Sequence, residues 1–77
     1  MTHELKIITP YFQDVRDREK NFEVRFDDRN FQAGDTLVLK EWADGQYTGR
    51  EANREITYIL HGGQFGIEKG YVVMSIK

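Results

Sequence analysis

The sequence contains no cysteine, only one proline and one serine, and no long apolar segment. The lack of cysteine excludes disulfides, zinc-thiolate sites, iron–sulfur clusters and a cysteine nucleophile. Disulfide-free domains of this size are typical of the reducing interior of the cell, so we expect a cytoplasmic protein. No segment approaches the roughly 20 apolar residues that span a bilayer, and the first residues lack a signal-peptide pattern, so no membrane association is expected.

A surplus of positive charge is also missing, since 11 Lys and Arg residues stand against 13 Asp and Glu residues, for a net charge of −2. Proteins held non-specifically on nucleic-acid phosphates usually carry a clear basic excess. Any nucleic-acid binding by this chain is therefore expected to use a local pocket. The length of 77 residues suits one compact domain, residues 1–77, and not two.

The motifs of several common active sites are absent. The glycine-rich segment 61–66 is not followed by the Lys-Ser/Thr of a phosphate-binding loop, so it predicts a turn. The single serine, Ser75, lies in a predicted strand, and no Ser-His-Asp arrangement is readable. His3 and His61 have no neighbours at metal-ligand spacing, and we expect neither a metal nor another cofactor.

The apolar pattern predicts one short helix and about five strands. The helix is expected to start at Thr9 and Pro10, because Thr is a good N-cap and Pro suits the first helical position. Phe12 and Val15 would then share its buried face. The predicted strands cover residues 4–8, 21–26, 36–42, 50–60 and 71–76. A helix after the first strand and five strands indicate an α+β, mainly β fold, a small barrel.

The clearest strand, residues 21–26, alternates apolar and polar side chains. Its apolar set is Phe22, Val24 and Phe26, and its polar set is Asn21, Glu23 and Arg25. A period of two places the sets on opposite faces, and we expect the apolar set in the core. By the same pattern Val72, Met74 and Ile76 form an inner face of the last strand, and Ile56, Tyr58 and Leu60 alternate in the strand before it.

The polar set of that strand, expected to face away from the core, holds the strongest candidates for a binding site. Glu23 and Arg25 leave one face of the strand about 6.5–7 Å apart, and Lys20 enters from the preceding turn. Such a set suits a nucleotide, because Arg binds phosphate or a base edge and Glu accepts from an exocyclic amine such as that of cytosine. The alternative is that Glu23 and Arg25 merely pair with each other, which would contribute about 0.2–1 kcal/mol.

Weaker candidates lie elsewhere in the chain. Arg29 and Arg50 each adjoin a turn from which a guanidinium could reach a phosphate, or they are solvated surface. Tyr47, like Trp42, could stack on a base, or it anchors a loop.

The chain resembles the ASCH domain of the PUA-like superfamily, and within it a short bacterial and phage branch catalogued as a domain of unknown function. The resemblance covers nearly the whole chain and rests on His3-Glu4-Leu5-Lys6, on Lys20 to Arg25 with Arg29, on Gly34 to Leu39 with Glu41, and on Tyr47-Thr48-Gly49-Arg50. It implies a small PUA-like β-barrel, a cleft beside the helix-to-strand junction, and RNA binding. It also implies that Lys6 and His3 flank this cleft.

One position departs from that family's pattern. The family often has Gly two residues before the motif Lys, whereas this chain has Arg18. A side chain disfavours positive φ, so the turn into the motif is expected to have a different shape.

Three functions follow as alternatives. The first is a module that binds RNA or a nucleotide-like ligand through Lys20, Glu23 and Arg25. The second is a small amidohydrolase acting on N4-acetylcytidine, as in one ASCH-like branch with a working Lys, Thr and Glu. Lys20 and Glu23 would be its catalytic residues, although Glu23 stands where that branch has Thr. The third is a phage or mobile-element accessory protein that acts through protein contacts. The sequence leaves the oligomeric state open.

Overall fold

The computed structural model describes all 77 residues and contains five strands and one helix after the first strand. The α+β, mainly β class predicted from the sequence is confirmed. The elements are β1 (Thr2–Ile8), α1 (Tyr11–Arg16), β2 (Phe22–Phe26), β3 (Thr36–Ala43), β4 (Gln46–His61) and β5 (Tyr71–Ile76). No helix of this structure has the length and apolar character needed to span a bilayer.

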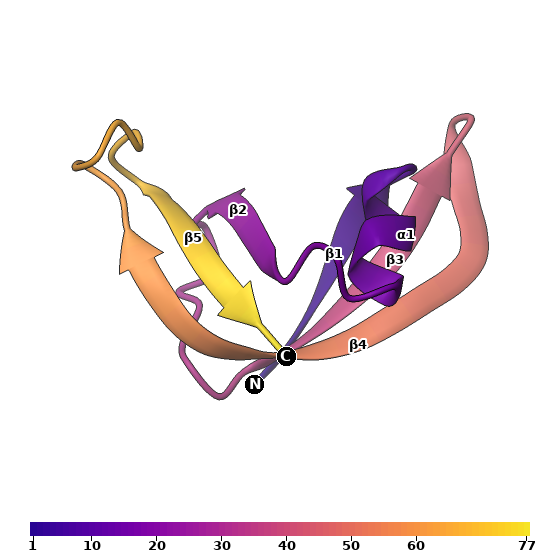
Figure 1. Ribbon diagram of the computed structural model, residues 1–77, viewed down its shortest axis with the longest axis horizontal. Coiled ribbons are helices and arrows are strands. Elements are labelled where there is room, and N and C mark those ends of the chain that lie inside the picture. Colours follow the sequence, from indigo (N-terminus) through magenta and orange to yellow (C-terminus); the bar gives the residue numbers. More distant parts are fainter.

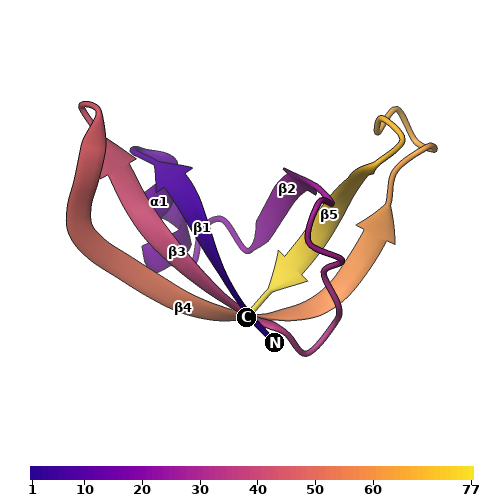
Figure 2. The same cartoon turned by 180° about the vertical axis from the view of Figure 1, so that it is seen from behind.

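The five strands form one bent sheet with the order β1-β3-β4-β5-β2, and only the β1–β3 pair is parallel. The long strand β4 belongs to both halves, because residues 46–55 pair with β3 and residues 56–61 pair with β5. Figure 1 shows the resulting V, with both chain termini at its base and α1 on the β1–β3 arm. Figure 2 shows the edge strands β1 and β2 on separate arms. No backbone pairing joins them, and a closed barrel stays a prediction.

The core lies on one face of both arms, which we call the inner face. The helix contributes Phe12 and Val15, as the sequence predicted, and β5 contributes Val72, Met74 and Ile76, also as predicted. The rest of the buried cluster consists of Leu5, Ile7, Phe31, Leu37, Leu39, Ala52 and Ile56. A helix of six residues is not stable alone, so the burial of its two apolar side chains holds it in place.

The start of the helix differs from the prediction. The helix begins at Tyr11 with Pro10 as N-cap, and no side chain caps it. The Thr9 hydroxyl instead donates a 2.6 Å hydrogen bond to the Glu41 carboxylate in β3. The charged acceptor explains the choice, since hydrogen bonds to carboxylates are stronger than those to neutral groups.

The two faces of β2 are the reverse of those predicted. Phe22, Val24 and Phe26 are 47%, 50% and 56% exposed, whereas Glu23 is only 4% exposed. The cause is the register with β5, which pairs Glu23 with Met74 and Arg25 with Val72, both in the core. The predicted core half of this strand therefore lies on the outer face, and the polar half points inward.

A second difference arises in β4, where a β-bulge interrupts the alternation between Ile56 and Tyr58. Ile56 is fully buried, but after the bulge Tyr58 is 66% exposed and Ile59 packs against the core. One extra residue moves every later side chain to the other face. Leu60 consequently shares the outer face with Tyr58.

Candidate functional site

The structure brings Lys20, Glu23 and Arg25 together into one cluster, which we call the Glu23 cluster. The Lys20 ammonium donates to Glu23 Oε2 at 3.2 Å and to the Phe22 carbonyl at 2.7 Å. Arg25 Nη2 lies 3.6 Å from Glu23 Oε1, too far for a hydrogen bond. Lys20 and Arg25 keep part of their side chains exposed, so the cluster opens toward solvent on the cationic side.

One carboxylate oxygen of this cluster has no hydrogen-bond partner. Glu23 Oε1 is buried and unbonded, although Oε2 is bonded to Lys20. Buried polar atoms are nearly always hydrogen-bonded, and leaving one unsatisfied costs about 1–3 kcal/mol, more for a charged group. Glu23 Oε1 is thus an acceptor that a ligand N–H or O–H could complete.

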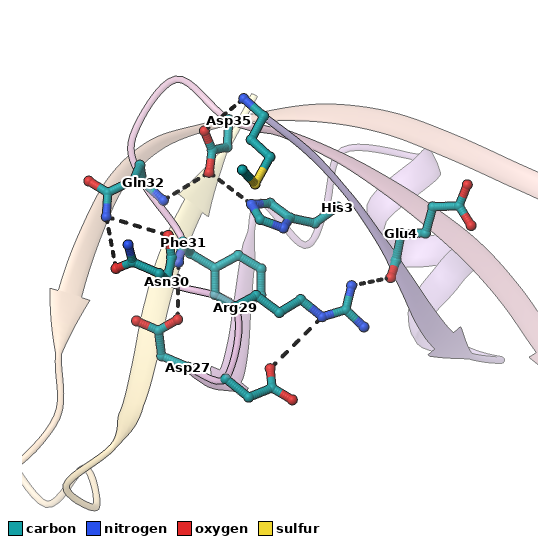
Figure 3. Close-up of polar contacts among 10 residues, drawn as sticks. His3, Glu4, Asp27, Arg29, Asn30, Phe31, Gln32 and Asp35 are labelled. Carbon is teal, nitrogen blue, oxygen red and sulfur yellow. Dashed lines mark hydrogen bonds and ion pairs between the residues drawn. The ribbon is translucent and has the colours of Figure 1, made fainter.

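Two arginines of this region also connect the edges of the sheet. Arg25 Nη2 donates to the Lys6 carbonyl at 2.8 Å, and Arg29 Nη1 donates to the Glu4 carbonyl at 2.6 Å. Figure 3 shows the Arg29 side chain reaching this carbonyl of β1. These contacts satisfy carbonyls on the outer edge of β1, the edge that no strand pairs, so part of each guanidinium serves the fold. Each guanidinium has five N–H donors, and each of these hydrogen bonds uses one of them.

The turn before Lys20 keeps the backbone conformation that glycine would favour. Arg18 has φ = 61°, so the expectation that its side chain would keep this position from positive φ was wrong. The Asn21 side chain donates to the Arg18 carbonyl at 2.8 Å, and the amides of Glu19 and Lys20 both donate to the Asp14 carbonyl. These bonds hold the turn and place Lys20 beside Glu23.

Replacing Arg18 with Gly is therefore expected to stabilise the protein by roughly 0.5–1 kcal/mol, because it relieves the left-handed conformation of a residue with a side chain. The substitution also removes a positive charge near Arg54. Burial is the main cause that lowers the pKa of Arg54, and the charge of Arg18 is the second. Thermal unfolding should show a rise in Tm of about 2–6 °C. Arg18→Ala removes the same charge but keeps Cβ, and an equal gain in that variant would contradict the backbone explanation.

A second cluster surrounds Glu41, and we call it the Glu41 cluster. This buried carboxylate accepts from the Thr9 hydroxyl at 2.6 Å and the Thr48 hydroxyl at 2.8 Å, and Arg50 Nε lies 3.7 Å away. The Thr9 bond above all, then the Thr48 bond, holds the pKa of Glu41 below its usual value. Opposite Glu41 the β3–β4 register shifts between Lys40 and Trp42, and this bulge aims Thr48 and Arg50 at the carboxylate.

Three of the weaker candidates gather near this bulge. The Lys6 ammonium lies 4.0 Å from the Trp42 ring centroid, and Trp42 packs edge-to-face with Tyr47 at 4.9 Å. A cavity of about 150 Å³ is lined by Lys40, Tyr47, Gly49, Arg50 and Glu51. Its cations are largely neutralised, since Arg50 faces Glu41, and a hydrogen bond from Lys40 to Glu4 raises the pKa of Lys40. Lys6, Tyr47 and Arg50 thus lie apart from the Glu23 side chain, on the other arm.

A third polar group lies near the base of the V. His3 is buried, with Nε2 2.8 Å from Asp35 Oδ2 and its ring edge-to-face on Phe31. Asp35 also accepts from the N-terminal ammonium group at 3.1 Å and from the Gln32 amide at 3.1 Å, as Figure 3 shows. His3 therefore ties β1 to the turn before β3, and it does not flank the Glu23 cluster.

The residues that sequence reasoning missed were Glu41, Thr9, Thr48 and Asp35. The signal for Glu41 was available, because it continues the inward alternation of Leu37 and Leu39. A carboxylate in such a position is a buried charge that must have partners. Thr48 and Thr9 carried no such signal, since their partner lies seven and 32 positions away. The structure holds no group of three or more His, Cys, Asp or Glu side chains arranged for a metal ion.

Comparison with known proteins gives two results. A family model described as a domain of unknown function, DUF3850, matches residues 2–76. A protein of Escherichia phage P2, described as an uncharacterized 12.9 kDa protein in the GpA 3′ region, is 46% identical over 55 residues. This alignment covers 71% of the chain but only 50% of the phage protein. The predicted place in a phage-related branch of unknown function is confirmed.

Proposed function

The chain belongs to the DUF3850 family, and we propose that it is a binding module for RNA or a nucleotide-like ligand. The proposal includes the ASCH-type, PUA-like relationship that the motifs resemble, with the V-shaped sheet as an opened form of that barrel. The ligand would bind at the Glu23 cluster. The single observation that carries this proposal is the unbonded, buried Oε1 of Glu23.

The chemistry of this cluster favours a nucleobase with an exocyclic amino group. The Glu23 carboxylate is an acceptor only, and the N4 amino group of cytosine is a donor. Lys20 and Arg25 border the carboxylate on its two sides, at 3.2 and 3.6 Å. Their free donors are suited to the ring carbonyl or a phosphate of the same ligand. The net charge of −2 argues against unspecific phosphate binding, so we expect affinity to reside in this local contact.

The proposal is tested by NMR titration of the protein with cytidine, uridine and short RNAs at low salt. We expect amide shifts among residues 18–29, and tighter binding of cytidine than uridine, because the O4 of uridine would place an acceptor against Glu23. Glu23→Gln should weaken cytidine binding about ten-fold, which corresponds to about 1.4 kcal/mol, and should reduce the preference over uridine. The matched control is Glu19→Gln, which changes an exposed carboxylate in the neighbouring turn.

Two outcomes would overturn this reading. One is the absence of any clustered shifts near residues 18–29 with all ligands. The other is cytidine binding that survives unchanged in Glu23→Gln while the variant keeps the wild-type spectrum. In that second case the bound ligand lies elsewhere, and the Glu23 cluster is only a structural ion pair.

No observation favours the amidohydrolase. The branch with that activity uses a Thr beside its Lys, but the two Thr hydroxyls that contact a carboxylate here, Thr9 and Thr48, both bind Glu41. Lys20 is paired with Glu23 and the Phe22 carbonyl. Hydrolysis of N4-acetylcytidine stays a prediction, and it is tested by assaying turnover in the wild type and in Lys20→Ala.

A further inference from the structure

The outer face of the β2–β5–β4 arm carries a set of exposed and half-buried apolar side chains, with the polar Ser75 among them. The strand registers place Phe22 and Tyr58 on either side of Ser75, Val24 and Leu60 on either side of Val73, and Phe26 beside Tyr71. We call this set, with Phe65 of the following loop, the outer patch. Phe65 is 80% exposed, the most exposed aromatic residue of the chain. Soluble monomers rarely expose apolar patches larger than a few hundred Å² without a function for them.

The size of the outer patch fits an interface between two proteins. Its five aromatic side chains are 37–80% exposed. With about 200 Å² for each ring, they leave roughly 500–600 Å² of mainly apolar surface in water. Two such patches in contact would bury about 1,000–1,200 Å², which is near the lower limit for a specific protein–protein interface.

A hollow in the patch fits a side chain better than a small molecule. It has a volume of about 260 Å³ and is lined by Val24, Gly66, Ile67, Glu68 and Tyr71. This is below the roughly 300–1,000 Å³ of usual ligand pockets. Phe65 adjoins this lining in the chain and is 80% exposed, so it is the side chain available to enter the hollow of a second copy.

Charges around the patch have both signs. The Lys20 ammonium lies 4.8 Å from the Phe22 ring at one end, and Glu68 lines the hollow near Tyr71. In an antiparallel two-fold arrangement the first end of one copy meets the second end of the other, which pairs opposite charges. The aliphatic centre of the patch suits a second copy better than a nucleic acid, whose phosphates are usually met by a basic patch on the contact surface itself.

We propose that the outer patch is a homodimer interface, in which two copies pack face to face about a two-fold axis. The interface uses the side chains of β2 that point away from the Glu23 cluster. One strand therefore serves two purposes: its polar side chains form the ligand site, and its apolar side chains form the dimer. The dimer does not depend on the ligand.

Sedimentation equilibrium over a range of protein concentrations tests this proposal. We expect a reversible dimer with a Kd on the order of micromolar. Val24→Lys places a charge at the centre of the patch, where the side chain is already half exposed, so the fold should persist while the Kd rises at least about ten-fold. The control is Tyr11→Lys, an equally exposed apolar residue of α1 outside the patch, which should leave the dimer unchanged.

Three results would overturn the proposal. The first is a wild-type protein that stays monomeric to about 1 mM. The second is a dimer that survives both Val24→Lys and Tyr58→Lys. The third is a monomer whose Phe26 and Tyr58 ring signals shift with oligouridine, which would make the patch a base-stacking surface. Val24→Lys should retain the amide shifts of the Glu23 cluster on cytidine titration, so failure of the dimer and failure of ligand binding are separate results.

Discussion

Phe12→Ala is expected to destabilise the protein by about 3–5 kcal/mol, the usual cost of truncating a buried Phe. The Phe12 ring is fully buried, and the Arg50 guanidinium lies over it at 4.9 Å. A domain of this length has a total stability of roughly 4–12 kcal/mol, so the loss takes much or all of the margin. We expect thermal unfolding followed by circular dichroism to show a fall in Tm of at least about 15 °C.

The control for this experiment is Phe22→Ala. The same substitution in β2 removes a ring that is half exposed on the outer face, and it should cost less than about 1.5 kcal/mol. The comparison is made at low protein concentration, where association through the outer patch adds little. If Phe22→Ala were as costly as Phe12→Ala, the orientation of β2 described above would be wrong.

Phe12 and Phe22 show which features of the fold could be predicted from the sequence and which could not. The residue spacing predicted both the helix that carries Phe12 and the strand that carries Phe22, and both elements exist. The alternation in β2 also separates two faces correctly. It does not say which face meets the core, because that depends on pairing with β5, about 50 positions later in the chain. Apolar character alone favoured Phe22, Val24 and Phe26 as core, and the register with Met74 decided otherwise.

In the candidate site, too, the contacts between residues close in the sequence could be predicted, and the long-range contacts could not. The sequence grouped Lys20, Glu23 and Arg25, and local geometry alone brings them together, since they lie within six positions of one another. It also grouped Lys6, Tyr47 and Arg50 with them, but these belong to the Trp42 and Glu41 side of the other arm. Nothing local could reveal that Arg25 and Arg29 bond to carbonyls of β1, because these contacts span 19 and 25 positions.

The burial of Glu23 follows from the same register and supports the proposed site. An acidic side chain opposite Met74 would be replaced easily by an apolar one if stability alone were at stake. Its open acceptor oxygen is a local defect of the fold, and such defects gather at functional sites. The outer patch is the complementary feature, since its half-exposed rings stabilise a monomer less than buried rings would. The unbonded oxygen of Glu23 and the exposed rings of the outer patch have one cause: the polar side chains of β2 point inward and its apolar side chains point outward.

Asp35→Asn is expected to lower the Tm at neutral pH by about 5–10 °C and to reduce the acid sensitivity of the fold. The carboxylate binds three partners: His3, the N-terminal ammonium group and the Gln32 amide. The hydrogen bond to His3 above all lowers the pKa of Asp35 from 3.8 to about 2. Because the folded state holds this proton less tightly than the unfolded state, the contribution of Asp35 is present above the unfolded pKa of 3.8 and is lost as the pH falls through about 2.

Urea unfolding at a series of pH values measures this effect. Between about pH 4 and pH 2 the wild-type free energy of unfolding should fall more steeply than that of Asp35→Asn, since the variant has no carboxylate at position 35 to protonate. Asp28→Asn is the matched control, because that carboxylate is exposed and lies 3.9 Å from Arg29. Parallel pH profiles for the wild type and Asp35→Asn would show that folding does not lower the pKa of Asp35. That result would contradict the His3–Asp35 contact between β1 and the turn before β3, whatever the Tm of the variant.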